Sequence, residues 1–343
     1  MSANKLRVLA LMHRHLIPPD KLEEGTDIKS APWRTEYDVV STLTGMGHEV
    51  RPLAVHDDLG DIRRTNDEWK PHIAFNLLEA FDDVTIFDQN VVSHLELLKL
   101  SYTGCNPRGL LLARDKSLSK KLLSYHRIHV PEFDVFRAGR PIRRNKRLTF
   151  PLIVKSLTQE ASIGISQASV VDTDEKLKER VTFIHESIGT AAIVEQYIEG
   201  REIYVGIMGN QALQALPVWE LFFKNMPDGA KHIATERVKW SVNYQNKYGI
   251  DSGPALDLPE AKNDEILHLC KRAYRALELS GYARIDLRLD AAGKIWVLEA
   301  NPNPQIARGE DFAASAEKAG LTYEAVLQRI INLGMRWQPE SVA

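Results

Sequence analysis

The stretch GYARIDLRLDAAGKIWVLEAN, residues 281–301, has the pattern of a β-hairpin. Two short apolar runs, residues 283–289 and 294–300, flank Asp-Ala-Ala-Gly at 290–293, a sequence typical of a tight turn. The Asn-Pro-Asn-Pro run that follows should end the second strand and stiffen the next loop, because proline cannot donate to a strand ladder. We therefore expect the rest of the chain to be organised around this hairpin.

Polar side chains of both strands gather on one face of the hairpin, because side chains alternate along a strand. The first strand presents Arg284, Asp286 and Arg288 together, and the second presents Val297, Glu299 and Asn301. Where the two faces coincide, Asp286, Glu299 and Asn301 converge beside Arg284. Two carboxylates and an amide are hard oxygen ligands that suit Mg²⁺ together with substrate phosphates. A charged hairpin that only faces solvent is the alternative interpretation.

The composition is that of an ordinary globular protein with room for several cores. The chain has 343 residues, of which 44% are hydrophobic and 26% charged, so it can form two or three domains. The net charge is −2, and both signs are spread along the chain. We therefore expect neither nucleic acid nor an anionic membrane as a partner.

Cysteine usage and hydropathy indicate the compartment. Cys105 and Cys270 are far apart and lack metal-ligand spacing, so we expect two free thiols in a reducing environment. No run approaches the ~18 apolar residues of a membrane span, and the apolar run at 6–12 is too short for a signal peptide. These features predict a cytoplasmic protein.

The first third of the chain alternates between strand and helix patterns. Apolar runs predict strands at 6–12, 48–55 and 72–78, and a helical period predicts helices at 34–46 and 86–100. This alternation predicts a small doubly wound α/β unit over residues 1–113, with a long loop at 16–33.

Two further units are expected, at 114–190 and 191–343. The central unit should contain helices at 115–127 and 174–187 and strands at 130–136 and 151–155. The C-terminal unit should contain a meander of strands at 191–198, 202–208 and 212–221, an irregular segment at 227–252, a helix at 263–279, the hairpin and a helix at 322–335. The expected fold class is α/β.

Two segments of the central part carry candidate nucleotide contacts. Lys155 ends an apolar strand, and the small-residue turn at 161–165, which contains Ser162, follows it. A lysine that faces a loop of exposed backbone N–H groups can hold phosphate oxygens, although a solvated lysine is the commoner case. Glu195 and Glu202 stand at the two ends of a strand connection and could serve an adenine and a ribose. An acidic hairpin connection is the alternative.

In this order, the pieces resemble the ATP-grasp superfamily, and within it the D-alanine–D-alanine ligase group. The matching features are Asp115-Lys116, Lys155, the loop at Ser162, the segment from Glu195 to Glu202, and Arg284-Ile-Asp286 with Glu299-Ala-Asn301. The resemblance covers nearly the whole chain and is most specific in the hairpin. It implies an ATP-grasp fold of three domains, with ATP held between the second and the third.

The resemblance also implies a role for each matched residue. Lys116 and Lys155 would contact phosphates, Glu195 and Ile198 the adenine, and Glu202 the ribose; Asp286, Glu299 and Asn301 would hold two Mg²⁺ ions, with Mn²⁺ as a substitute; Lys239, Arg284 and Ser162 would serve in catalysis. In the family reaction, ATP phosphorylates a small-molecule carboxylate, and an amine then displaces phosphate to form an amide. Related ligases are often dimers, so a homodimer is expected.

The substrate positions depart from the family pattern. Glu79 stands where D-alanyl ligases carry a histidine. Glu310 and Asp311 stand where these ligases offer a serine and an apolar residue to the acceptor carboxylate, which two acids would repel. Glu36 lies near the family's glutamate for the first substrate's amine. We therefore expect an acceptor that lacks this carboxylate or carries an extra cation.

Three classes of function stay open. The favoured one is an ADP-forming carboxylate–amine ligase that does not join two D-alanines, with a genuine D-alanine–D-alanine ligase as the alternative in that class. An ATP-grasp kinase would keep the phosphate on its small-molecule product. A non-catalytic nucleotide-binding protein is disfavoured, because it has no need of metal ligands and phosphate lysines.

Overall fold

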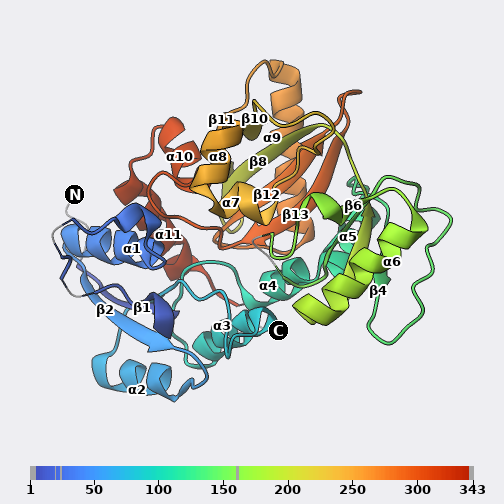
Figure 1. Ribbon diagram of the computed structural model, residues 1–343. Coiled ribbons are helices and arrows are strands. Elements are labelled where there is room, and N and C mark those ends of the chain that lie inside the picture. Colours follow the sequence, from blue (N-terminus) through green and yellow to red (C-terminus); the bar gives the residue numbers. More distant parts are fainter. Residues whose placement is uncertain (1–4, 20, 24, 160–161, 340–343) are drawn as a thin grey trace.

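The computed structural model describes residues 5–19, 21–23, 25–159 and 162–339, which form three β-sheets surrounded by helices (Figure 1). The sheets have three, four and six strands and follow one another along the chain. The expected α/β class is confirmed. Within the described ranges, no helix has both the length and the apolar composition that a bilayer crossing requires.

The N-terminal sheet is parallel, with the strand order β2-β1-β3. Its elements are β1 (Arg7–His13), α1 (Arg34–Gly45), β2 (Glu49–Val55), α2 (Gly60–Trp69), β3 (Ile73–Asn76), α3 (Asp88–Leu97) and α4 (Pro107–Arg114). The strand–helix alternation agrees with the prediction, and α2 and α4 are additional. α2 buries only Ile62 and Thr65, and its sequence is mostly polar, so few apolar residues mark it as a helix.

The central sheet is antiparallel, with the order β4-β7-β5-β6. Its elements are α5 (Lys116–Tyr125), β4 (Phe133–Phe136), β5 (Leu152–Ser156), β6 (Val170–Val171), α6 (Asp174–Phe183) and β7 (Ala192–Gln196). The meander predicted from residue 191 is wrong in its first strand, because β7 pairs with β4 and β5 and not with the strands that follow it. We propose to keep the three-unit division and to place its second boundary after β7 instead of at 190/191.

The third sheet has the order β11-β10-β8-β12-β13, with β9 paired to β8. Its part of the chain contains β8 (Arg201–Met208), β9 (Gln214–Ala215), β10 (Trp219–Phe223), α7 (Glu236–Trp240), α8 (Val242–Tyr248), β11 (Ile250–Pro254), α9 (Glu260–Ala276), β12 (Tyr282–Leu289), β13 (Ile295–Pro302), α10 (Asp311–Lys318) and α11 (Tyr323–Arg336). The prediction of an irregular segment at 227–252 is wrong. α7 and α8 lie there, with Thr235 and Ser241 as their N-caps. Each helix is too short for its apolar residues to show a helical period.

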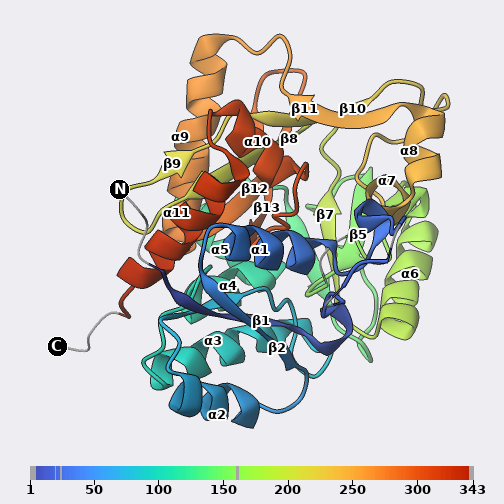
Figure 2. The ribbon, with the colours of Figure 1, turned by 90° about the vertical axis from the view of Figure 1, so that its left-hand side faces the viewer.

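The last helix packs against the N-terminal part of the chain. α11 packs against α1 and β3, beside the N-terminal sheet (Figure 2). One buried apolar cluster joins Val8 and Phe75 of that sheet to Ile330 and Ile331 of α11 and to Tyr282 of β12. The first and last parts of the chain therefore share a core, which positions the N-terminal sheet relative to the hairpin.

Candidate active site

The hairpin forms as its sequence predicts, with β12 and β13 antiparallel. Asp286 lies directly opposite Glu299, and Arg284 lies opposite Asn301. The Asn301 amide donates through Nδ2 to Asp286 at 2.9 Å, which leaves its oxygen as the atom available to a cation. The structure therefore brings the three predicted metal ligands together.

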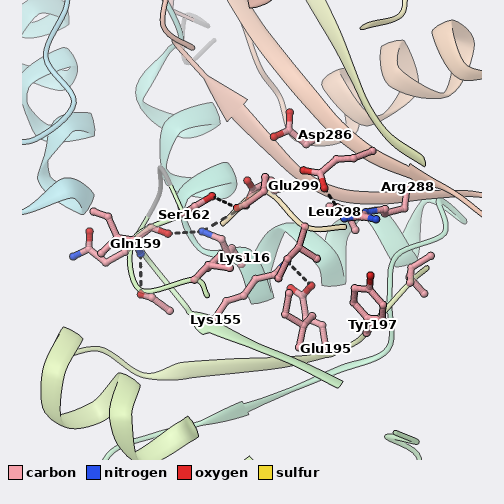
Figure 3. Close-up of a pocket in the computed structure, with 18 of the residues that line it drawn as sticks. Lys116, Lys155, Gln159, Ser162, Glu195, Tyr197, Asp286, Arg288, Leu298 and Glu299 are labelled. Atoms are coloured by element: carbon pink, nitrogen blue, oxygen red, sulfur yellow. Dashed lines mark hydrogen bonds and ion pairs between the residues drawn. The ribbon is translucent and has the colours of Figure 1, made fainter. Parts of the chain in front are cut away.

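A β-bulge interrupts the pairing next to these residues. The register shifts between Asp286 and Leu287, so Leu298 is an extra residue in β13. Val297 consequently packs in the apolar core with Leu287, and the prediction that it shares a face with Glu299 is wrong. Both Leu298 and Glu299 line the pocket described below, an arrangement that strict alternation does not anticipate (Figure 3). β13 also continues to Pro302, beyond the expected end of the strand, as its position at the sheet edge permits.

A pocket lies between the central sheet and the third sheet (Figure 3). Side chains from α5, β5, β7, β8, α7, β12 and β13 line it. The predicted site residues among them are Lys116, Lys155, Ser162, Glu195, Ile198, Glu202, Lys239, Asp286 and Glu299. Arg284 and Asn301 adjoin the pocket through their hydrogen bonds to Asp286.

Glu195 is held between two lysines next to this pocket. Its Oε1 lies 3.3 Å from Lys120 Nζ, and its Oε2 lies 3.0 Å from Lys155 Nζ. Burial acts to raise the pKa of Glu195, but the two lysines outweigh burial and hold that pKa below its usual range. Both carboxylate oxygens are therefore directed at lysines, and the predicted contact of Glu195 with an adenine stays a prediction.

Lys120 is a buried lysine that supports two residues of the pocket, Glu195 and Leu298, and the motif assignment missed it. It is completely buried, and its Nζ donates to the backbone carbonyl of Leu298 at 2.6 Å besides contacting Glu195. It follows Lys116 by four residues on α5, so the two lysines project from one face of the helix. That spacing is the sequence signal that could have identified it.

Glu299 is surrounded by positive charge. Lys116 Nζ lies 3.7 Å from Glu299 Oε2 and also donates to the carbonyl of Gln159 at 2.7 Å. Burial acts to raise the pKa of Glu299, but Lys116, Lys155 and Lys239 together lower it to about 2. A carboxylate that stays ionised at neutral pH is well suited to bind a cation.

Glu202 enters the pocket from β8 and is bonded by two neighbours. Arg288 Nη2 donates to Glu202 Oε2 at 2.5 Å, and the Tyr204 hydroxyl donates to Oε1 at 3.0 Å. Arg288 lines the same pocket and also donates to the carbonyl of Gly200. Strand alternation identifies the face of Arg288 correctly, but nothing in the pattern predicts its role.

Arg284 and Asp286 form a two-pronged ion pair. Arg284 Nε and Nη2 donate to the two oxygens of Asp286 at 2.8 and 2.9 Å. Burial raises the pKa of Asp286 in spite of the opposing charge of Arg284. The guanidinium also lies 4.6 Å from the ring centre of Tyr204, and its Nη1 lies 3.7 Å from Asp311 Oδ2. Arg284 thus connects the predicted cation site to the start of α10.

α7 packs over the loop that contains Ser162. The Ser162 hydroxyl donates to a backbone carbonyl just before α7 at 2.6 Å, and the Gly164 N–H donates to the Glu236 carboxylate at 3.3 Å. These bonds hold α7 against the loop, so that Lys239 reaches the pocket. Ala161, the first residue of the predicted turn, lies outside the described residues.

Glu36 and Glu79 form the first group of predicted substrate acids. Glu36, on α1, is only 4% exposed, and its Oε2 has no hydrogen-bond partner within the described ranges. Burial, reinforced by the charge of Glu79, raises the pKa of Glu36 to about 7. The two carboxyl groups are therefore near enough to repel each other, and a cation between them would be favoured.

Glu310 and Asp311 form the second group, and neighbouring groups compensate both. Arg34 Nη1 donates to Glu310 at 2.8 Å, and the Ser252 hydroxyl donates to Asp311 at 2.6 Å. Burial raises the pKa of Glu310 against the effect of Arg34. These partners come from distant parts of the chain, and the expectation that the two acids repel an acceptor carboxylate stays a prediction.

Comparison with known proteins supplies independent findings. A family model described as D-ala D-ala ligase C-terminus matches residues 122–332. A D-alanine–D-alanine ligase of Bordetella petrii is 33% identical over 252 residues, which are 71% of this chain and 71% of that protein. An uncharacterized protein of Sinorhizobium fredii is 29% identical over 320 residues, 89% of each chain. The structure of a D-alanine–D-alanine ligase from Bacillus anthracis complexed with ATP gives a TM-score of 0.74 at 21% identity, over 96% of this chain and 98% of that chain.

The fold and the pocket define the class of the protein, an ATP-grasp enzyme. The chain belongs to the D-alanine–D-alanine ligase family and is an ATP-dependent, ADP-forming ligase. Enzymes of this family work with Mg²⁺, and the oxygen donors of Asp286, Glu299 and Asn301 have the chemistry that this ion requires.

Proposed function

We propose that this ligase joins a small-molecule carboxylate to an amine through an acyl phosphate, with ATP in the pocket of Figure 3. The observation that carries the proposal is the arrangement of charge around that pocket. Four cationic side chains, Lys116, Lys155, Lys239 and Arg288, line the pocket together with the two carboxylates of the hairpin, Asp286 and Glu299. Cations bind phosphates, and carboxylates hold the metal that accompanies phosphates.

A homodimer stays a prediction, which sedimentation of the purified protein would check.

We propose two Mg²⁺ ions, or Mn²⁺ in their place, at Asp286, Glu299 and Asn301. Bound there, the ions would neutralise charge on the transferring phosphoryl group. Glu202 and the backbone at Ile198 are the proposed contacts of the ribose and the adenine. Glu195 also stays a proposed contact of the adenine, and its ion pair with Lys155 suits it to positioning that lysine.

The chemistry follows from the charges of the chain. A carboxylate oxygen of the first substrate attacks the γ-phosphorus as the bond to ADP breaks, while Lys116, Lys155 and Lys239 stabilise the negative charge. The amine nitrogen then attacks the acyl carbon, loses a proton, and phosphate leaves. The guanidinium of Arg284 would stabilise the tetrahedral oxyanion, and α7 over the Ser162 loop would exclude the water that hydrolyses an acyl phosphate.

We infer that the substrates are not two D-alanines. The support is Glu79, together with Glu36, a nearly buried acid whose Oε2 has no partner among the described residues. A positively charged group between these two acids would keep Glu36 ionised and satisfy its oxygen. Glu36 matches the family's glutamate for the first substrate's amine, so the departure in this pair is Glu79. A substrate that carries an additional cation, such as a diamine or a basic amino acid, fits this arrangement.

Release of ADP and phosphate by the purified protein with Mg-ATP tests the reaction. Pools of carboxylates and amines, and D-alanine alone, serve as substrates; Glu299→Gln is the blank, and the exposed Glu179→Gln is the matched control. We expect phosphate release that needs one carboxylate pool and one amine pool together, and none with Glu299→Gln.

Each other outcome contradicts a defined part of the proposal. Full activity with D-alanine alone would refute the substrate inference and leave the ligase chemistry intact. ADP without free phosphate would indicate a kinase. ATP binding without turnover in any pool would count against catalysis.

The double substitution Glu310→Ser and Asp311→Leu tests the acceptor side. The structure bonds these acids to Arg34, Ser252 and Arg284, so their removal also frees positive charge near the acceptor. We expect the KM of the native acceptor to rise by about tenfold or more, with the KM of ATP unchanged. Unchanged acceptor kinetics would refute the role of these acids.

A further inference from the structure

The end of β1 and the segments after β2 and β3 bring histidine and aspartate side chains together, away from the nucleotide pocket. His13 is the last residue of β1, and it pairs in register with Val55, the last residue of β2. His56 follows Val55 directly, so the parallel pairing places the two histidines side by side at the carboxyl edge of the sheet. Asp83, from the loop after β3, completes the group.

The spacing of the three ligand atoms is that of a metal site. His13 Nε2 lies 3.2 Å from His56 Nδ1 and 3.3 Å from Asp83 Oδ1, and His56 Nδ1 lies 3.9 Å from Asp83 Oδ1. Nitrogen and oxygen ligands about 2.0–2.1 Å from a tetrahedral Zn²⁺ are separated from one another by about 3.3 Å. One ion can therefore contact all three atoms with little movement.

Asp83 reaches this position from an unusual turn. Asp82 and Asp83 both have positive φ angles, 52° and 55°, at the centre of a tight turn closed by Phe81 and Val84. The Asp82 N–H donates to the carbonyl of His56 at 2.7 Å, which ties the turn to the end of β2. Two consecutive non-glycine residues in this conformation are energetically costly, and such strain persists where the surrounding structure requires it.

The electrostatic surroundings favour a cation. Asp57 and Asp82 lie close to His56 and add negative charge. The basic side chain of Arg14 is bonded to His15, since its Nε donates to His15 Nε2 at 3.3 Å. The His13 and His56 side chains are only 17% and 11% exposed, so a bound ion would be partly shielded from water.

We propose that His13, His56 and Asp83 bind a divalent transition-metal ion of the Zn²⁺ class. The ring centre of His15 lies 5.2 Å from that of His13 and 6.5 Å from that of His56, so rotation of its side chain would supply a fourth ligand. When Nε2 of His13 binds the ion, the ring proton lies on Nδ1, so Nδ1 can no longer accept a hydrogen bond. The bond lost is the long one, 3.4 Å, from the His15 N–H.

The ion would fasten the loop after β3 to the ends of β1 and β2. That loop begins near Glu79 and contacts the central unit through Thr85, whose hydroxyl lies 3.5 Å from Gln159 Oε1. The role is therefore structural and separate from the Mg²⁺ site. Imidazole nitrogen selects Zn²⁺, Ni²⁺ or Cu²⁺, whereas the oxygen donors of the hairpin select Mg²⁺.

Co²⁺ absorption spectroscopy on the full chain distinguishes the two sites. Excess Mg²⁺ is present throughout to occupy the oxygen site. We expect intense visible bands of four-coordinate Co²⁺ that Zn²⁺ abolishes, since an octahedral oxygen site absorbs only weakly. His13→Ala and His56→Ala should each weaken Zn²⁺ binding by at least about tenfold. The exposed His268→Ala is the matched control and should bind as the native chain does.

Two further measurements distinguish the loss of the metal site from misfolding and from effects at the nucleotide site. Far-UV circular dichroism must show that the alanine variants are folded. Zn²⁺ should raise the melting temperature of the native chain and of Glu299→Gln but not that of His13→Ala, whatever the outcome of the ligase assay. Absence of four-coordinate bands, or native Zn²⁺ binding by both folded alanine variants, would overturn the proposal.

Discussion

Glu36 combines deep burial with an acidic neighbour. Its carboxyl group is surrounded by protein on α1, and Glu79 contributes a repulsive charge. Both effects favour the protonated form, so burial first and Glu79 second raise its pKa from 4.5 to about 7. Sequence identifies Glu36 only through its loose alignment with a family glutamate. The pKa depends on neighbours that the sequence does not reveal.

The pH dependence of folding should therefore report on Glu36. Between about pH 4.5 and pH 7 the unfolded chain ionises this group while the folded chain keeps the proton, so stability is lost as the pH rises through that window. The loss amounts to at most about 3 kcal/mol. We expect Glu36→Gln to unfold at higher urea concentration than the native chain at about pH 8, and at a similar concentration near pH 4.5.

The exposed Glu179→Gln is the control for this measurement. It should follow the native chain at both pH values. If Glu36→Gln is no more stable than Glu179→Gln at about pH 8, the assignment of the raised pKa is wrong.

At the scale of elements, α7 is a single short helix that brings Lys239 to the pocket. Thr235 caps it by accepting from the Val238 N–H at 3.2 Å, and bonds to the Ser162 loop hold it in place. α11 has an equivalent cap, Thr322, which accepts from the Ala325 N–H at 3.2 Å. The two caps have the same chemistry, but one helix borders the pocket and the other packs in the core.

Removal of the two caps should therefore have different effects, one on the KM of ATP and the other on the stability of the fold. Thr235→Ala should cost about 1 kcal/mol of local helix stability, raise the KM of ATP, and leave the thermal unfolding temperature nearly unchanged. Thr322→Ala should lower the unfolding temperature and leave the KM of ATP unchanged. Steady-state kinetics and thermal unfolding of both variants measure the two quantities. Equal effects of both substitutions on the KM of ATP would contradict the role given to α7.

For the whole molecule, the shared core of α11 and the N-terminal sheet is the decisive contact. Ile330 is fully buried in the apolar cluster that also contains Val8 and Phe75 of the sheet. Tyr282 of β12 belongs to the same cluster, so the hairpin shares this core. The N-terminal α/β unit depends on a helix that lies more than 200 residues after it.

Ile330→Ala should consequently destabilise the first and the last parts of the chain together. A buried isoleucine truncated to alanine costs about 2–5 kcal/mol, because the cavity is only partly refilled. We expect hydrogen exchange of β1 and of α11 to accelerate in parallel. Leu97→Ala, at a side chain that is 80% exposed, is the control and should change neither. Faster exchange in α11 alone would show that the two parts do not share a core.

The sequence by itself determined the local features of this protein. Period-two alternation identifies the hairpin and places Asp286 next to Glu299, and the motif spacing from Lys116 to Asn301 identifies the family. Strand and helix patterns also give the order of most elements. These features are predictable because they depend on residues that are close in the chain.

The tertiary structure alone decided which distant groups meet. It assigns β7 to the central sheet, inserts Leu298 into the pocket through a bulge, and directs Glu195 at two lysines. It also pairs Glu310 with Arg34 and brings His13, His56 and Asp83 together at one edge of the N-terminal sheet. The physical reason is that pairing partners, burial and pKa values depend on distances through space, which neither periodicity nor spacing along the chain encodes.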